Sequence, residues 1–162
     1  MSRLDSAIRR LVAQRACLGR AAALIADLSG PVLEIGLGNG RTYDHLRELL
    51  PGREIFCFDR RVAAHPDCIP DAGHLFLGEL AATLPEARRR LGATAALVHV
   101  DIGTGDERAS RQTGAWLAAR LPVLVVPGAV LVSDQPLADP ALAELEPPEG
   151  VAAGRYFTYR MR

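Results

Sequence analysis

Short apolar runs alternate with helical patterns along most of the chain. The runs have the length and composition of strands that are buried on both faces; they cover residues 31–36, 55–58, 75–77, 95–100 and 129–133. Apolar residues recur at helical spacing between them, and the predicted helices cover residues 40–50, 83–92 and 106–121. Strands that alternate with helices predict a doubly wound α/β domain, with a mostly parallel sheet and helices on both faces.

The N-terminal part of the chain is predicted to be helical. Residues 1–30 form this segment, in which we expect one kinked helix or two short ones, with a break at Gly19 and a stop at Gly30. Its apolar positions at helical spacing are Leu4, Ile8, Leu11, Leu18, Ala22 and Ile25.

Two local signals place further boundaries. Thr83 and Glu86 have the spacing of a capping box, which predicts a helix that opens there with Pro85 in its first turn. Pro127 and Gly128 predict a turn before the last parallel strand.

Composition narrows the class of protein. The chain is 49% hydrophobic and 23% charged, and no linker or repeat divides it, so residues 1–162 are expected to form a single globular domain. The 19 basic and 19 acidic residues cancel, so neither a nucleic acid nor an anionic membrane is indicated as a partner. All basic residues are Arg, which excludes Schiff-base chemistry and a lysine general base.

The cysteines and the apolar runs indicate where the protein works. Cys17, Cys57 and Cys68 include no CxxC pair, so neither a disulfide framework nor a cysteine zinc site is indicated. A reducing, cytoplasmic location is therefore expected. No apolar run approaches the about 20 residues that a membrane span requires.

A glycine-rich loop follows the first predicted strand, in the segment Glu34-Ile35-Gly36-Leu37-Gly38-Asn39-Gly40. Such a loop lets backbone N–H groups approach a small charged ligand at a helix N-terminus. A dinucleotide fingerprint needs its third glycine where this chain has Arg41, and no G-K-[ST] is present, so an NAD-dependent oxidoreductase and a P-loop are disfavoured.

Two carboxylates indicate which ligand the loop would bind. Glu34, at the end of the first strand, would repel a pyrophosphate and attract a cation, and S-adenosylmethionine (SAM) carries a sulfonium and an ammonium. Asp59, at the end of the second strand, can accept both hydroxyls of an adenosine ribose.

These segments resemble the motifs of the class I, Rossmann-like SAM-dependent methyltransferases. The resemblance lies in residues 33–40, 56–60, 98–101 and 126–134, and the short chain without insertions is similar to a small group of bacterial SAM methyltransferases.

The sheet of the class I methyltransferases ends in a long antiparallel hairpin. Residues 136–154 are expected to be loop with at most one short helix, which leaves 155–161 as a clear strand, so we expect a shortened C-terminal hairpin.

The resemblance implies a set of cofactor-binding residues. The glycine loop would face the methionine part of SAM, and Thr42 would bind its carboxylate. Glu79 has the position of an acid that receives the adenine amino group, with Leu80 against the ring. The predicted cofactor-binding residues are Glu34, Gly36, Leu37, Gly38, Gly40, Thr42, Asp59, Arg60, Gly78 and Glu79.

The leading hypothesis is methyl transfer from SAM to a small-molecule acceptor by in-line displacement, with Asp101 as the catalytic base. The alternatives are a SAM-binding module without transfer, and an Asp101 that only caps the following loop or helix. His99 is interpreted as a hydrogen-bonded core histidine rather than a base.

A homo-oligomer is expected, because the apolar fraction is high and the N-terminal helix offers an added apolar face.

A metal site is a further alternative. Asp101, Asp134 and Gln135 resemble the ligand set of divalent-metal-dependent O-methyltransferases, but Gln replaces Asn and the lysine base is missing. We favour an Asp134 that hydrogen-bonds the loop after its strand, and we predict no metal.

Overall fold

The computed structural model describes residues 2–162. The helices are α1 (Arg3–Leu24), α2 (Arg41–Leu49), α3 (Leu80–Leu91) and α4 (Glu107–Ala118), with short 3-10 turns at Pro66–Cys68, Ala72–His74 and Pro122–Leu124. The strands are β1 (Val32–Ile35), β2 (Ile55–Asp59), β3 (Leu75–Leu77), β4 (Ala95–Val100), β5 (Val125–Ser133), β6 (Leu142–Leu145) and β7 (Phe157–Met161).

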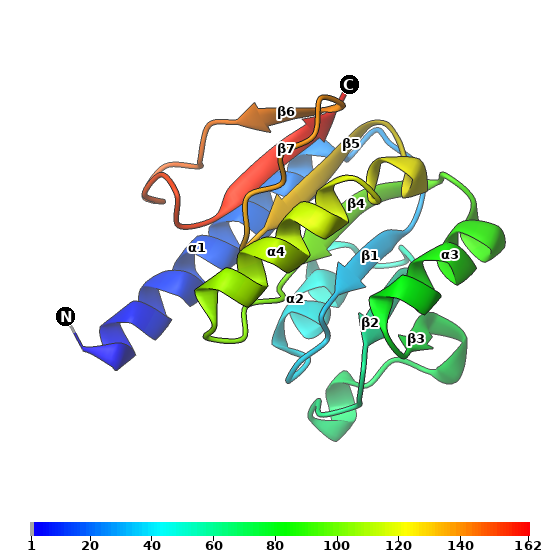
Figure 1. The fold of residues 1–162 in the computed structure, drawn as a ribbon, viewed down its shortest axis with the longest axis horizontal. Helices are drawn as coiled ribbons and strands as arrows, with labels where there is room; N and C mark the ends of the chain where they lie inside the picture. Colours follow the sequence, from blue (N-terminus) through cyan, green and yellow to red (C-terminus); the bar gives the residue numbers. More distant parts are fainter. Residues whose placement is uncertain (1) are drawn as a thin grey trace.

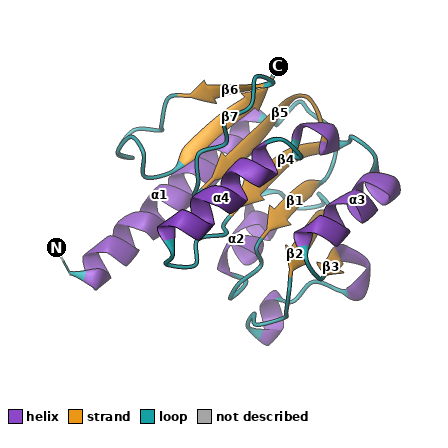
Figure 2. Ribbon diagram, viewed as in Figure 1, coloured by secondary structure: helices purple, strands orange, loops and turns teal. Residues whose placement is uncertain are grey.

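The strands form one seven-stranded sheet in the order β3-β2-β1-β4-β5-β7-β6 (Figure 2). Strands β1 to β5 pair in parallel, whereas β7 runs antiparallel to both β5 and β6. The strand order reverses between β1 and β4, which is the point where open α/β sheets bind ligands. The predicted doubly wound, mostly parallel fold is confirmed.

Helices cover both faces of the sheet (Figure 1). Leu18 of α1 and Leu46 of α2 belong to one buried apolar cluster, and Leu84 of α3 and Leu117 of α4 belong to another. Since successive residues of a strand point to opposite faces, each parallel strand contributes to both clusters. Within residues 2–162, none of the helices has the length and apolar character needed to cross a membrane.

Arg3–Leu24 forms a single helix, so the break predicted at Gly19 is wrong, and the helix ends before the predicted stop at Gly30. Leu18 and Ala21, on either side of this glycine, are buried, and their packing holds the helix together at a position of low intrinsic propensity. The helix begins with a capping box, in which Ser2 and Asp5 bond each other's backbone N–H.

The apolar stripe predicted on this helix is only partly correct. Leu18 and Ile25 are buried, but Leu4, Ile8 and Leu11 are 69%, 50% and 37% exposed. The reason is that the first half of α1 runs out past the strands (Figure 1), so no sheet lies beneath it.

The capping box predicted at Thr83 is also wrong, because α3 begins three residues earlier, at Leu80. Thr83 is buried inside the helix, and its hydroxyl donates to the backbone oxygen of Glu79 at 3.2 Å. Pro85 therefore lies in the helix interior, where it removes one backbone donor. Burial of Leu84 and Ala87 beside it keeps the segment helical.

The last part of the sheet differs from the prediction in two places. Pro127 and Gly128 lie within β5, where the register with β4 shifts and Gly128 has a φ of +81°, so they form an irregularity in a strand rather than a turn before one. Residues 142–145 form β6, a strand that the sequence analysis missed, and it completes a hairpin with β7. The hairpin thus has two strands, of four and five residues.

Candidate functional site

Three cavities share Asp101 and Gly103 at the carboxyl ends of the parallel strands. The glycine-loop cavity, of about 410 Å³, includes Gly36, Gly38, Asp59 and Gly78 in its wall. The Thr42 cavity, of about 250 Å³, includes Gln14, Gly38 and Thr42. The α4 cavity, of about 780 Å³, includes Arg10, Arg111, Asp134, Arg155 and Tyr156. Asp101 therefore lies where all three spaces meet.

The glycine loop uses its glycines in different ways. A Cβ on Gly36, whose φ is +95°, would lie 2.2 Å from the backbone oxygen of Asp101, so this glycine lets β1 and β4 end close together. Gly38, whose φ is +53°, has nothing within 4 Å of a Cβ, so its backbone is open to a ligand. The N–H of Gly38 donates to Oδ2 of Asp59 at 2.9 Å. The carboxylate of β2 thus holds the loop that follows β1.

The predicted cofactor-binding residues divide between those that line a cavity and those that do not. Gly36, Gly38, Asp59, Arg60 and Gly78 line the glycine-loop cavity, together with Leu80, and Gly36, Leu37, Gly38 and Thr42 line the Thr42 cavity. The Leu37 side chain is buried in the core, so only its backbone faces the site. Glu79 is exposed at the start of α3 and lines neither cavity. A Cβ on Gly40 would lie 2.4 Å from Cβ of Cys68, so Gly40 serves the packing of that loop.

Glu34 lies behind the glycine loop. It is fully buried, its Oε2 lies 2.7 Å from Nδ1 of His99, and its Oε1 accepts a hydrogen bond from the hydroxyl of Thr42. Burial lowers the pKa of His99, but the adjacent Glu34 carboxylate outweighs it and holds this pKa above its usual value. The predicted burial and hydrogen bonding of His99 are therefore confirmed.

Two buried side chains that the sequence analysis missed continue this network. Nε2 of His99 lies 2.7 Å from the hydroxyl of Tyr156. The amide nitrogen of Gln14 donates both to that hydroxyl, at 3.0 Å, and to Oδ2 of Asp101, at 2.9 Å. Gln14 was detectable in principle, because it lies at helical spacing between Leu11 and Leu18 of the predicted apolar stripe.

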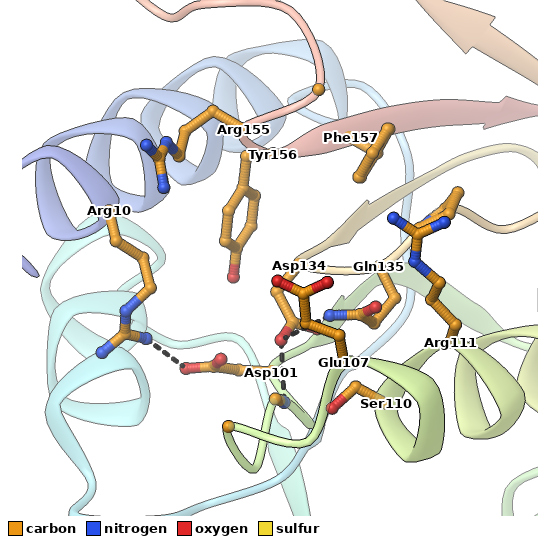
Figure 3. A pocket seen from close by; sticks show the side chains of 14 residues that line it. Arg10, Asp101, Glu107, Ser110, Arg111, Asp134, Gln135, Arg155, Tyr156 and Phe157 are labelled. Carbon is orange, nitrogen blue, oxygen red and sulfur yellow. Dashed lines mark hydrogen bonds and ion pairs between the residues drawn. The ribbon is translucent and has the colours of Figure 1, made fainter. Parts of the chain in front are cut away.

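Asp101 does not cap the helix that follows it. The N-cap of α4 is Asp106, whose carboxylate accepts the N–H of Ala109. Asp101 instead faces α1, where it accepts from Gln14 and lies 3.6 Å from the guanidinium of Arg10 (Figure 3).

Asp134 holds the loop after β4. Its carboxylate accepts the N–H groups of Ile102 and Gly103, at 3.3 and 2.8 Å, and so bonds the loop of the neighbouring strand. It also accepts the side-chain amide of Gln135, in the loop after its own strand, at 3.4 Å. Burial, and then the charge of Asp101, raise the pKa of Asp134. Among residues 2–162, no group of three His, Cys, Asp or Glu side chains is arranged to hold a metal ion.

Comparison with known proteins identifies the family. Residues 1–161 match the family model described as S-adenosyl-L-methionine methyltransferase. The chain belongs to this family. It is 45% identical to an S-adenosyl-L-methionine methyl transferase from Silicibacter pomeroyi DSS-3, with a TM-score of 0.96 over 100% of this chain and 99% of that one. A search of curated proteins found no match.

More distant solved structures of methyltransferases share the fold alone. The antibiotic-resistance methyltransferase Kmr is 15% identical, with a TM-score of 0.56 over 91% of this chain and 92% of that one. A 1,6-didemethyltoxoflavin-N1-methyltransferase from Burkholderia thailandensis is 19% identical, with a TM-score of 0.51 over 91% of this chain and 79% of that one.

SAM is the cofactor of this methyltransferase, as the sequence predicts. The residues present fit it. The open backbone at Gly38 and the carboxylate of Asp59 border one cavity, and Thr42 borders the next. The Glu34 carboxylate, which we predicted to meet the ligand, lines none of these spaces.

Proposed function

We propose that the protein transfers a methyl group from SAM to a small polar molecule that binds in the α4 cavity. The observation that carries this proposal is the position of Asp101, which borders both the glycine-loop cavity and the α4 cavity. A group in that position is within reach of a donor on one side and of an acceptor on the other.

The donor side is assigned to residues of β1, β2 and the loop before α3. The Asp59 carboxylate accepts the ribose hydroxyls, and the backbone of Gly38 lies against the cofactor. Gly78 and Leu80 border the adenine, and Thr42 borders the methionine part. Glu34 acts from behind, because its bond from Thr42 fixes the first turn of α2. SAM supplies a methyl group that its sulfonium has already activated, so the protein's main task is alignment.

The acceptor side is a charged pocket. Arg10, Arg111 and Arg155 approach the α4 cavity from α1, α4 and the segment before β7, and Asp101 and Asp134 lie at its base (Figure 3). Such a wall favours a polar acceptor over an apolar one. We assign Asp101 to the acceptor as a catalytic residue, whose carboxylate accepts a hydrogen bond from a polar group of the acceptor and so orients it.

The test measures binding and turnover separately. Calorimetry with S-adenosylhomocysteine (SAH), with NADH as the matched control, is expected to detect only SAH. Mass spectrometry then follows SAH formation from SAM with a panel of phenols, hydroxy acids, amines and thiols. Binding without turnover of any of them would favour a SAM-binding module, and binding of NADH alone would refute the site.

Self-association is a second part of this proposal. Leu4, Ile8, Leu11 and Val12 are exposed on the part of α1 that extends past the sheet, and they lie at helical spacing. We assign this face to a contact between copies of the chain, because exposed apolar side chains gathered on one face are typical of interfaces.

A further inference from the structure

A continuous series of buried polar groups runs from the back of the glycine loop to the α4 cavity. Glu34 of β1 contacts His99 of β4, and His99 contacts Tyr156, which precedes β7. Glu34 and His99 are fully buried, and Tyr156 is 3% exposed. The Tyr156 ring nevertheless forms part of the wall of the α4 cavity, with its hydroxyl directed toward the Asp101 side (Figure 3).

The hydrogen atoms of this series can be placed from its chemistry. Asp101 accepts from the amide nitrogen of Gln14, and a carboxylate only accepts, so this nitrogen donates its two hydrogens to Asp101 and to Tyr156. The Tyr156 oxygen therefore accepts from Gln14, and its own hydrogen points to Nε2 of His99. Nδ1–H of His99 donates to the Glu34 carboxylate. A neutral His99 satisfies every member of the series.

We infer that Tyr156 and His99 remove the proton of the methyl acceptor, with Tyr156 as a further catalytic residue and His99 and Glu34 as positioning residues behind it. The inference rests on the proposed function, because it requires an acceptor in the α4 cavity. The arrangement follows the general logic of a reacting hydroxyl, a histidine and a carboxylate that orients the histidine.

The acceptor's O–H or N–H proton passes to the Tyr156 oxygen while the phenolic proton of Tyr156 passes to Nε2 of His99. The freed electron pair of the acceptor atom forms the new bond to the methyl carbon, and the electrons of the broken carbon–sulfur bond remain on sulfur. His99 ends as an imidazolium paired with Glu34, and Tyr156 is neutral before and after the step.

Asp101 is the competing base, and the network separates the two roles. The Gln14 amide nitrogen donates to both this carboxylate and Tyr156 and cannot accept a proton. A proton taken up by Asp101 therefore cannot pass through Gln14 to His99. Oδ2 of Asp101 is also engaged by Gln14 and lies near the Arg10 guanidinium. Asp101 therefore orients the acceptor, and Tyr156 takes its proton.

The expected pH dependence follows from the groups around His99. These are Glu34 on β1, Tyr156 before β7, Gln14 on α1, and Asp101 and Asp134 at the ends of β4 and β5. The pair accepts a proton only when Nε2 of His99 is unprotonated. Methyl transfer is therefore expected to rise with pH through the pKa of His99, which Glu34 holds above its usual value against the effect of burial.

The first test is nitrogen NMR of SAH-bound protein labelled at histidine, from about pH 6 to 9. The expected result is an Nδ1–H tautomer of His99 whose Nε2 becomes protonated as the pH falls. Tyr156→Phe is expected to shift that titration, whereas Tyr159→Phe, a buried β7 tyrosine that binds the N–H of Leu137, is not. An Nε2–H tautomer, or an imidazolium over the whole range, would overturn the inference even with no acceptor identified.

The second test uses any panel compound that the wild-type protein methylates. Tyr156→Phe is expected to lower kcat by about 10²-fold or more and to remove its rise with pH, with unchanged SAH affinity. Tyr159→Phe serves as the folding control. Wild-type kcat in folded Tyr156→Phe, together with loss of the pH dependence in Asp101→Asn, would assign the base to Asp101 instead. If the wild-type protein does not bind SAH, the proposed function is refuted, whereas the role of Tyr156 and His99 is judged by the titration of His99.

Discussion

Replacing Asp59 by Ala tests the cofactor site most directly. The carboxylate lies at the end of β2, lines the glycine-loop cavity and accepts the N–H of Gly38 at 2.9 Å. Its proposed role is to accept the ribose hydroxyls of the cofactor. Hydrogen bonds to a charged group contribute about 1.5–3 kcal/mol. At about 1.4 kcal/mol per tenfold, Asp59→Ala should therefore raise the Kd of SAH about 10- to 150-fold.

The assay is titration calorimetry of SAH into the wild-type protein, Asp59→Ala and Asp71→Ala. Asp71 is a matched control, because it is an exposed aspartate that accepts the N–H of Gly73 at 2.8 Å but lines none of the three cavities. Its removal should change the Kd by no more than about twofold. Equal SAH affinity in the two variants, with wild-type unfolding temperatures for both, would refute the assignment of Asp59.

Three further predictions concern stability and assembly. Thr42→Val removes the donor to the buried Glu34 and should lower the free energy of unfolding by about 1–3 kcal/mol in urea titrations, whereas the exposed Thr94→Val should not. Because the folded pKa of His99 is raised above its unfolded value of about 6.5, its contribution to stability is full below that pH and is lost as the pH rises through the folded pKa. Thermal unfolding should show this fall in the wild-type protein and not in Glu34→Gln; equal slopes would contradict it. Light scattering should give an oligomer that Ile8→Ser weakens, and a monomer at all concentrations would refute self-association.

The parts of the fold that the sequence predicts correctly are those set by local pattern and full burial. All four residues of β1 are buried, as are all six of β4, so their apolar runs alone identify them. The errors lie where packing decides. Leu142–Leu145 pairs only with β7 at the edge of the sheet, and this strand of four residues, of which only Leu142 is buried, is too short to show a pattern. Thr83 has the sequence of a helix cap but is buried one turn inside α3.

The candidate site divides in the same way. Gly36 and Gly38 lie in the loop after β1, and Asp59 is the last residue of β2, so motifs of adjacent residues reveal them. Gln14 and Tyr156 meet in space although 142 residues separate them, and no local spacing signals such a contact. The sequence therefore predicts the donor side far better than the acceptor side, which α1 and the segment before β7 complete.

The buried pair of Glu34 and His99 couples stability and the proposed activity with opposite signs. Below the raised pKa of His99, the imidazolium and the carboxylate stabilise the fold, but Nε2 already carries a proton and cannot take another. Above it, Nε2 can accept the proton that Tyr156 passes on, and the ionic part of the stabilisation is lost. The fold tolerates this loss because Nδ1–H of His99 and the hydroxyl of Thr42 still donate to Glu34. The same contacts explain why the Glu34 carboxylate is buried behind the glycine loop. Its two oxygens must accept from His99 and Thr42 in both protonation states of His99, and burial keeps water and ligands from competing for them.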